Sequence, residues 1–311
     1  MGSMSNTKIS VVIPCYKTGM RVDALVTEIA AVLGPFTEQS FEIIMVVDGS
    51  PDNTWTLVSA AAKKYDFVRG INLMRNYGQH SALLAGVRAA HGQVIVTIDD
   101  DFQHSPSDIP KLTGALNDDV DIAYGASIEE EHSFIRNIAS NAYKKFIGSL
   151  LRAEGVNLAS AFRAFKKDLV PEFQGSDDLY APLDLMLTWA SNKSVGVPLQ
   201  MLQREDGAST YTIRGLLRHA LNAITGYSIA PLRLVSFLGL FTFGISFIVA
   251  IVVLVNYLMG RIEVAGFPTL VILVSMFAGV QLLSLGIIGE YLGRLHMRSM
   301  GRPRYVIRDE I

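Results

Sequence analysis

The first half of the chain alternates short apolar runs of strand length with segments of helical period. The apolar runs cover residues 9–13, 41–47, 68–73, 94–98 and 120–124. The helical segments cover residues 21–33, 54–65 and 80–91. This alternation predicts an α/β fold with a mostly parallel sheet and helices on both faces. Ligands of such sheets bind beyond the carboxyl ends of the strands, so polar residues that follow strands are the first candidates for a site.

The last third of the chain is dominated by two long apolar segments. Residues 234–258 and 266–289 contain no Asp, Glu, Lys or Arg, and each exceeds the roughly 20 residues that cross a bilayer. A buried pair of soluble helices is the alternative. Arginines lie outside both outer ends of the pair, and the positive-inside rule then predicts a transmembrane hairpin whose outer ends are cytoplasmic.

Two basic amphipathic segments precede the hairpin, at residues 133–152 and 211–226. They fit helices that lie in a membrane interface, or two ordinary surface helices. The predicted organisation has four parts, which are a head at residues 5–210, a juxtamembrane helix at 211–232, two spans at 233–290 and a basic tail at 291–311.

The distribution of charge supports a soluble head on a membrane-bound tail. Charged residues make up 18% of the chain, against roughly 25% in soluble domains. Residues 1–210 hold 18 Lys and Arg against 25 Asp and Glu, a net −7, whereas residues 211–311 hold 9 against 4, a net +5. An acidic head excludes a nucleic-acid binder, in which a basic patch dominates. No signal-peptide pattern opens the chain, so we expect a cytoplasmic head.

The strongest chemical signal is the segment VIVTIDDDFQ at residues 94–103. In extended chain Asp99 and Asp101 point to one side, with Gln103 in the same row, and Asp100 points to the other. Two carboxylates and an amide make an oxygen-rich site that suits Mg²⁺ or Mn²⁺. The simpler interpretation is a polar turn after a strand.

Two further strand ends carry weaker signals. Asp48 follows the run at 41–47 in FEIIMVVDGSPDNT, where it fits a contact to a nucleotide base or ribose, although Asp-Gly-Ser is also common in turns. Pro14 and Tyr16 end the segment ISVVIPCY, where the ring fits base stacking or a simple cap on the core. The lone Cys15 cannot form an intramolecular disulfide and is interpreted as a core residue.

Taken together and in this order, the motifs ISVVIPCY, EIIMVVDGSPDNT, LMRNYGQHSALLAG and TIDDDFQ resemble the family 2 glycosyltransferases of the GT-A fold. The resemblance continues through SFIRNIAS, SAFRAF, APLRLVSFLG and IIGEYLGR, and so covers nearly the whole chain. The subgroup it resembles transfers a sugar to a polyprenyl phosphate.

The resemblance implies roles for particular residues. It places Asp99, Asp101 and Gln103 at the metal and diphosphate. It also implies a nucleotide pocket, formed by Pro14, Tyr16, Asp48, Arg75, Asn76 and Asp99. It implies a site for the lipid phosphate as well, formed by Arg136, Ser140 and Arg204. On this basis Asp99, Asp101, Arg136 and Arg204 are the predicted catalytic residues.

Several positions depart from the family pattern. One acid before Asp48 is replaced by Val47, and the usual Tyr-Asn-Glu is Tyr16-Lys17-Thr18 here. The segment LASAFR at residues 158–163 lacks both acids of its family counterpart. Because these changes surround the nucleotide and sugar pockets, they bear on the donor more than on the reaction.

The expected enzyme is an inverting, metal-dependent transferase of the bacterial inner membrane. Its donor is a nucleotide-sugar, UDP-linked by family majority, and its acceptor is a polyprenyl phosphate such as undecaprenyl phosphate. A phosphomonoester is already largely dianionic at neutral pH, so no general base is assigned, and Asp184 is the fallback. A homo-oligomer, a tetramer by resemblance, is expected. The alternatives are a catalytically degenerate membrane scaffold and a processive polysaccharide synthase.

Overall fold

The computed structural model describes residues 9–36, 40–127, 160–171, 182–200, 230–260 and 266–311. The chain divides into two compact units, one made of residues 1–209 with 302–311 and the other of residues 210–301. The predicted amphipathic segments at 133–152 and 211–226 lie outside the described residues.

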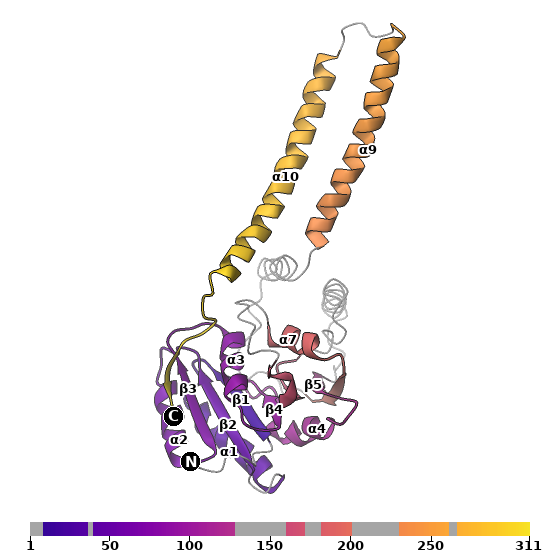
Figure 1. The fold of residues 1–311 in the computed structure, drawn as a ribbon. Coiled ribbons are helices and arrows are strands. Elements are labelled where there is room, and N and C mark those ends of the chain that lie inside the picture. Colours follow the sequence, from indigo (N-terminus) through magenta and orange to yellow (C-terminus); the bar gives the residue numbers. More distant parts are fainter. Residues whose placement is uncertain (1–8, 37–39, 128–159, 172–181, 201–229, 261–265) are drawn as a thin grey trace. The chain divides into compact units, whose positions relative to one another are not determined.

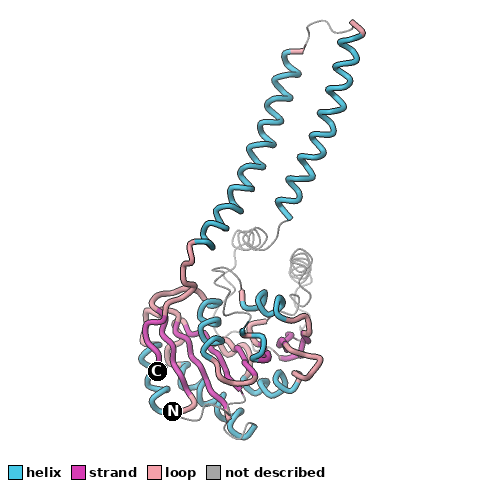
Figure 2. The backbone as a smooth tube through the Cα atoms, in the orientation of Figure 1, coloured by secondary structure: helices cyan, strands magenta, loops and turns pink. Residues whose placement is uncertain are grey.

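The first unit is built on an eight-stranded sheet (Figures 1 and 2). Its order is β7-β5-β6-β4-β1-β2-β3-β8. The strands are β1 Ile9–Cys15, β2 Phe41–Val47, β3 Val68–Leu73, β4 Val94–Thr97, β5 Ile122–Ser127, β6 Arg163–Lys166, β7 Ser194–Leu199 and β8 Ile307–Glu310. β1 to β4 run parallel, and β6 and β8 pair antiparallel to their neighbours. The predicted α/β sheet is therefore confirmed, although it is mixed rather than mostly parallel because β6 and β8 pair antiparallel, and β6, β7 and β8 add to the five predicted strands.

Helices cover both faces of this sheet. The α-helices of the first unit are α1 Arg21–Phe36, α2 Thr54–Lys64, α3 Gln79–Ala89, α4 Ile109–Gly114 and α7 Leu183–Ala190. Alternate residues of β1 and β2 face opposite sides. Val11 and Ile13 lie in one core cluster with Val26 of α1, whereas Gly86 of α3 lies against Val12 and Val46. Burial on both faces explains the almost continuous apolar runs of the parallel strands.

Close packing of α3 on the sheet depends on a missing side chain. A Cβ at Gly86 would come within 2.4 Å of Val12 Cγ1 and 2.9 Å of Val46 Cγ2. Glycine therefore lets the helix approach the sheet, and this approach fixes the start of α3 beside the carboxyl ends of the parallel strands.

The second unit contains the two long helices α9 Ala230–Leu258 and α10 Phe267–Ser299 (Figure 1). They cover the two apolar segments recognised in the sequence. Over the part of the chain that the structure describes, none of the helices is found to be long and apolar enough to cross a membrane.

Candidate functional site

The loops that follow β1, β2, β3 and β4 carry most of the predicted site residues. These four strands are parallel neighbours in the order β4-β1-β2-β3, so their carboxyl ends lie along one edge of the sheet. Polar groups that are distant in sequence are joined there by hydrogen bonds, described below. The predicted residues Arg136, Ser140 and Arg204 lie outside the described residues.

The acidic loop after β4, residues 99–103, is half-buried and held by hydrogen bonds. Gln79, the first residue of α3, donates from Nε2 to Asp99 Oδ1 over 2.7 Å. The backbone N–H of Gln103 donates to Asp101 Oδ1 over 3.1 Å. Phe102, between Asp101 and Gln103, has a φ of 56°, in the left-handed region that non-glycine residues seldom adopt. Such strained residues cluster at functional sites.

The carboxylates of the acidic loop also repel one another. Burial, and then the negative charge of Asp101, raise the pKa of Asp99 to about 6, while Arg163 opposes that rise. A cation placed between the two carboxylates would relieve this repulsion. In the described part of the chain, no group of three or more His, Cys, Asp and Glu is arranged to hold a metal ion. Two carboxylates nevertheless fit Mg²⁺, which keeps water ligands and is completed by substrate phosphates.

Asp100 has a different partner from its two neighbours. Thr18 Oγ1, in the loop after β1, donates a hydrogen bond to Asp100 Oδ2. Burial raises the pKa of Asp100, and the Thr18 hydrogen bond opposes that rise. Asp100 therefore joins the β1 loop to the acidic loop, while Asp99 and Asp101 have other contacts.

Asp48, after β2, holds the next loop in place. It is 3% exposed, and its Oδ1 and Oδ2 accept the backbone N–H groups of Tyr77 and Gly78, each over 2.7 Å. Burial raises the pKa of Asp48, and these two hydrogen bonds oppose that rise. The predicted contact to a nucleotide is not tested by this geometry, but both carboxylate oxygens already brace the loop between β3 and α3.

The loop after β2 passes close to the loop between β3 and α3, and this close approach requires a glycine after Asp48. Gly49 has a φ of 57°, and a Cβ there would lie 2.2 Å from the carbonyl carbon of Arg75. Arg75 and Asn76 are exposed on the loop between β3 and α3. The Arg75 guanidinium lies 4.8 Å from the Tyr77 ring centroid, and Asn76 Oδ1 accepts the N–H of Gly78 over 3.1 Å.

Pro14 and Tyr16 lie at the end of β1. Pro14 is buried within the strand and pairs in register with Val46. Tyr16 is 44% exposed, and the Lys17 ammonium lies 5.6 Å from its ring centroid. An exposed ring at a strand end is available to stack on a planar ligand. Cys15 between them is buried, and burial raises the pKa of its thiol, so it is an inert core residue.

A partly buried ion pair lies next to β4. Arg163 on β6 is 2% exposed, donates from Nε to Thr97 Oγ1 over 3.0 Å, and forms an ion pair with Asp184 on α7. Asp184, the fallback for a general base, is thus engaged with a cation. Arg163, Thr18 and Gln79 had no predicted role in the site. The signals that could have pointed to Arg163 and Gln79 are an arginine in an otherwise apolar segment and the motif RNYGQHSA, which contains Gln79.

Comparison with known proteins identifies the family of this chain. The family model for glycosyl transferase family 2 matches residues 10–172. A curated relative from Aeromonas hydrophila, an undecaprenyl-phosphate 4-deoxy-4-formamido-L-arabinose transferase, is 31% identical and covers 98% of this chain and 95% of its own. A transferase of the same description from Yersinia pestis is also 31% identical, covering 98% and 94%. The chain therefore belongs to glycosyl transferase family 2.

A solved structure shows the same fold at much lower identity. Mannosyl-3-phosphoglycerate synthase from Rubrobacter xylanophilus superposes with a TM-score of 0.51 at 15% identity, covering 73% of this chain and 74% of its own. The likeness concerns the fold, a mixed α/β sheet with flanking helices of the GT-A kind.

Proposed function

We propose that this protein is a membrane-bound transferase that moves a sugar from a nucleotide-sugar, most simply a UDP-sugar, to undecaprenyl or another polyprenyl phosphate. The observation that carries the proposal is the pair Asp99 and Asp101 at the end of β4, with Asp99 held by Gln79. Family membership and the curated relatives named for undecaprenyl-phosphate sugar transfer support the same reaction.

The donor is proposed to lie along the carboxyl edge of β1 to β3. Tyr16 offers an exposed ring to the base, and Arg75 and Asn76 are exposed on the neighbouring loop that Asp48 braces. Asp99, Asp101 and Gln103 would hold Mg²⁺ or Mn²⁺ with the donor diphosphate. Such an ion neutralises the negative charge that develops on a leaving diphosphate.

The acceptor phosphate is proposed to be oriented by cations from the sequence-predicted set, Arg136 and Arg204, with Ser140. Charge-assisted hydrogen bonds from arginine suit a phosphate. A dianionic phosphate needs orientation rather than deprotonation to attack, and direct attack inverts the anomeric carbon. The engagement of Asp184 with Arg163 supports a reaction without a protein base.

We also propose that the apolar segments at 234–258 and 266–289 form a membrane hairpin in the bacterial inner membrane, with the head and both outer ends cytoplasmic. The sequence supports this through their length and the flanking arginines. A polyprenyl chain leaves lipid at a cost of about 0.8 kcal/mol per CH₂, so the site must come to the bilayer. A homo-oligomer is proposed by resemblance alone.

The decisive experiment measures transfer to undecaprenyl phosphate from UDP-, GDP- and dTDP-sugars, with Mn²⁺ or with EDTA, in detergent. The wild type is compared with Asp101→Ala. A glycolipid that forms only with metal and only with the wild type supports the reaction and names the donor. If no donor yields a glycolipid and no nucleotide binds, the scaffold alternative replaces the proposal.

The hairpin has its own test. Glu263→Cys places a thiol between the two apolar segments, and Lys64→Cys, on α2, is the matched position in the head. In intact spheroplasts an impermeant maleimide should label residue 263 and spare residue 64. Equal labelling, or labelling of residue 64 alone, would contradict the proposed topology.

A further inference from the structure

The β1 loop, residues 16–20, is attached to the segment that follows β2. The backbone N–H of Lys17 donates to Ser50 Oγ over 2.8 Å. The backbone N–H of Gly19 donates to Thr54 Oγ1 over 3.1 Å. Ser50 lies in the loop after β2, and Thr54 is the first residue of α2. Two hydrogen bonds therefore hold the β1 loop to its neighbour along the edge of the sheet.

Thr18, in the same loop, makes a contact in a different direction. It is 3% exposed, and its Oγ1 donates to Asp100 Oδ2 in the acidic loop. β1 lies between β2 and β4 in the sheet, so the β1 loop is held to the loops that follow both neighbouring strands. A buried hydroxyl that loses its partner destabilises the structure around it. Thr18 is therefore a fixed point between the β1 loop and the acidic loop.

Backbone strain is found close to both ends of this hydrogen bond. In the part of the chain that the structure describes, the non-glycine residues with a positive φ are Lys17, at 57°, and Phe102, at 56°. Lys17 directly precedes Thr18, and Phe102 follows Asp100 by two positions. Strained conformations persist where the surrounding structure over-determines them, and they cluster at sites that clamp a ligand. The Thr18 hydrogen bond therefore joins two strained loops.

The joined loops carry candidate contacts for the two ends of one ligand. Tyr16, two residues before Thr18, has the exposed ring, and Asp99 and Asp101 flank Asp100. A nucleoside diphosphate has a planar base at one end and a charged diphosphate at the other. We propose that Thr18 is a positioning residue that sets the spacing between the ring and the carboxylates, so that a nucleoside diphosphate fits across both loops. The identity of the ligand rests on the proposed function, whereas the attachment of the two loops does not.

Three variants separate the Thr18 hydroxyl from the shape of the side chain. Thr18→Val removes the hydroxyl and keeps the shape, whereas Thr18→Ser keeps the hydroxyl and should restore the wild-type behaviour. Thr27→Val makes the same chemical change at an exposed position of α1. It controls for any general effect of replacing threonine by valine.

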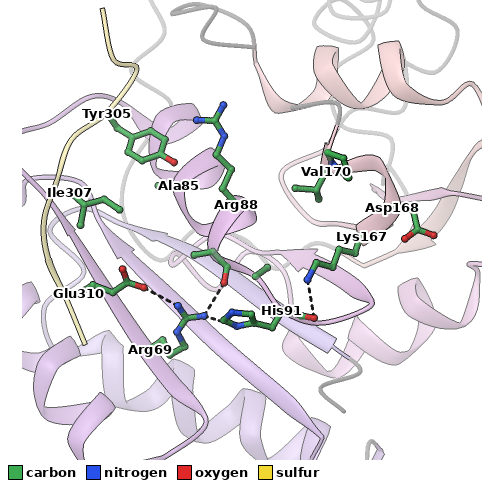
Figure 3. Close-up of a pocket in the computed structure, with 13 residues that line it drawn as sticks. Arg69, Ala85, Arg88, His91, Lys167, Asp168, Val170, Tyr305, Ile307 and Glu310 are labelled. Atoms are coloured by element: carbon green, nitrogen blue, oxygen red, sulfur yellow. Dashed lines mark hydrogen bonds and ion pairs between the residues drawn. The ribbon is translucent and has the colours of Figure 1, made fainter. Parts of the chain in front are cut away.

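A further control removes a different long-range contact of the head. Arg69 on β3 forms an ion pair over 2.8 Å with Glu310 on β8, in the C-terminal segment, residues 302–311. Figure 3 shows this pair in a cavity that the last residues of α3 also line. Gln79, the residue that contacts Asp99, is the first residue of α3. Glu310→Gln therefore breaks a contact between distant segments at the opposite end of α3 from the proposed donor site.

The binding test uses UDP and GDP as probes, each with Mn²⁺, in calorimetry on the full-length protein in detergent. We expect Thr18→Val to weaken binding of the preferred nucleotide about 10-fold, as loss of a supporting partner does at metal sites. Thr18→Ser, Thr27→Val and Glu310→Gln should bind as the wild type does. Unchanged binding in Thr18→Val, or an equal loss in Glu310→Gln, would overturn the proposal.

Steady-state kinetics distinguish positioning from a general loss of structure. In Thr18→Val the KM for the nucleotide-sugar should rise about 10-fold, while the KM for the lipid phosphate stays within about twofold. A purely structural role of Thr18 would instead lower the fraction of active enzyme and leave both KM values unchanged. That result, or equal changes in both KM values, would contradict the proposal.

Hydrogen exchange tests the attachment of the loops without any ligand. In Thr18→Val the amides of residues 16–20 and 99–103 should both exchange about fivefold faster, as expected when one hydrogen bond no longer opposes local opening. The amides of β2 should keep their rates. Faster exchange in one loop alone, or throughout the head, would overturn the role of Thr18. If the wild type binds neither UDP nor GDP, the proposed function fails, while hydrogen exchange still decides whether Thr18 joins the loops.

Discussion

Arg163 on β6 and Asp184 on α7 form a partly buried ion pair that ties α7 to β6, the antiparallel neighbour of β4, which precedes the acidic loop. The Arg163 side chain is 2% exposed and that of Asp184 is 22% exposed. Arg163 also donates to Thr97, two residues before Asp99. This ion pair therefore supports the acidic site from within the protein.

Removing one partner of this ion pair should destabilise the folded protein. Arg163→Met leaves a carboxylate of α7 without its cation, and we expect a loss of about 3–5 kcal/mol in unfolding free energy. The double variant Arg163→Met with Asp184→Leu should be more stable than Arg163→Met alone, because no buried charge is left uncompensated. Urea denaturation of the wild type, Arg163→Met, Asp184→Leu and the double variant measures this, and strictly additive losses would contradict it.

The variant Asp184→Asn tests whether Asp184 acts as a general base. Because Asp184 is paired with Arg163, the variant should lose stability while the pH profile of the remaining transferase activity keeps its shape. Disappearance of a limb of the kcat profile, in protein shown to be folded by circular dichroism, would instead assign Asp184 a role in proton transfer.

Gly49→Ala should disrupt the crossing of the β2 and β3 loops. The new Cβ would lie 2.2 Å from a backbone carbon of Arg75, at a φ of 57°, so the loop must move. We expect a loss of about 3 kcal/mol or more in stability, together with weaker nucleotide binding. Gly114→Ala is the control, because a Cβ there meets nothing within 4 Å, and it should change the melting temperature little.

If the proposed function holds, Asp101→Asn should abolish most of the transfer, with a loss of at least about 100-fold in kcat/KM, because a charge proposed to bind the cation is removed. Asp118→Asn removes an exposed carboxylate elsewhere in the head and serves as the control for net charge. The assay is donor-dependent glycolipid formation at saturating Mn²⁺. Comparable activities in the two variants would show that the acidic loop does not hold the ion.

Glu42 should make stability depend on pH. Burial alone would raise its pKa, but hydrogen bonds from Ser10, the backbone N–H of His91 and Arg69 lower it below its ordinary value of 4.5. A lowered folded pKa means that the unfolded chain binds protons more readily. The stabilisation is therefore full above that ordinary value and is lost as the pH falls through the folded pKa.

Glu42→Gln should remove this dependence. We expect the variant to be less stable by about 2 kcal/mol at pH 7 and to approach the wild type at acid pH. The control is Glu28→Gln, an exposed position on α1. The measurement is urea denaturation at several pH values, and a constant difference between Glu42→Gln and wild type across them would contradict the prediction.

Local pattern was enough to predict the parallel core of the sheet. The runs at 41–47 and 68–73 coincide with β2 and β3, because a strand buried on both faces must be apolar throughout. The positions of Asp48 and Asp99 after their strands follow from the same pattern. Both residues could be chosen as candidate site residues from the sequence, because carboxylates at the ends of buried strands need partners.

Tertiary structure alone decided which partners those carboxylates take. Asp48 braces the Tyr77–Gly78 backbone, Asp100 accepts from Thr18, and Asp99 accepts from Gln79. These contacts join residues that lie 20 to 82 positions apart in the chain, so no local period records them.

The C-terminal segment shows the same limit most clearly. Its composition predicted only a basic tail, yet β8 pairs with β3 and Arg304 is buried while Arg302 and Arg308 are exposed. A four-residue edge strand has too few positions for a hydrophobic period. The sequence by itself determined the parallel core of the sheet, the acidic loop and the family. Only folding determined which charges are buried, because burial depends on what packs against each residue.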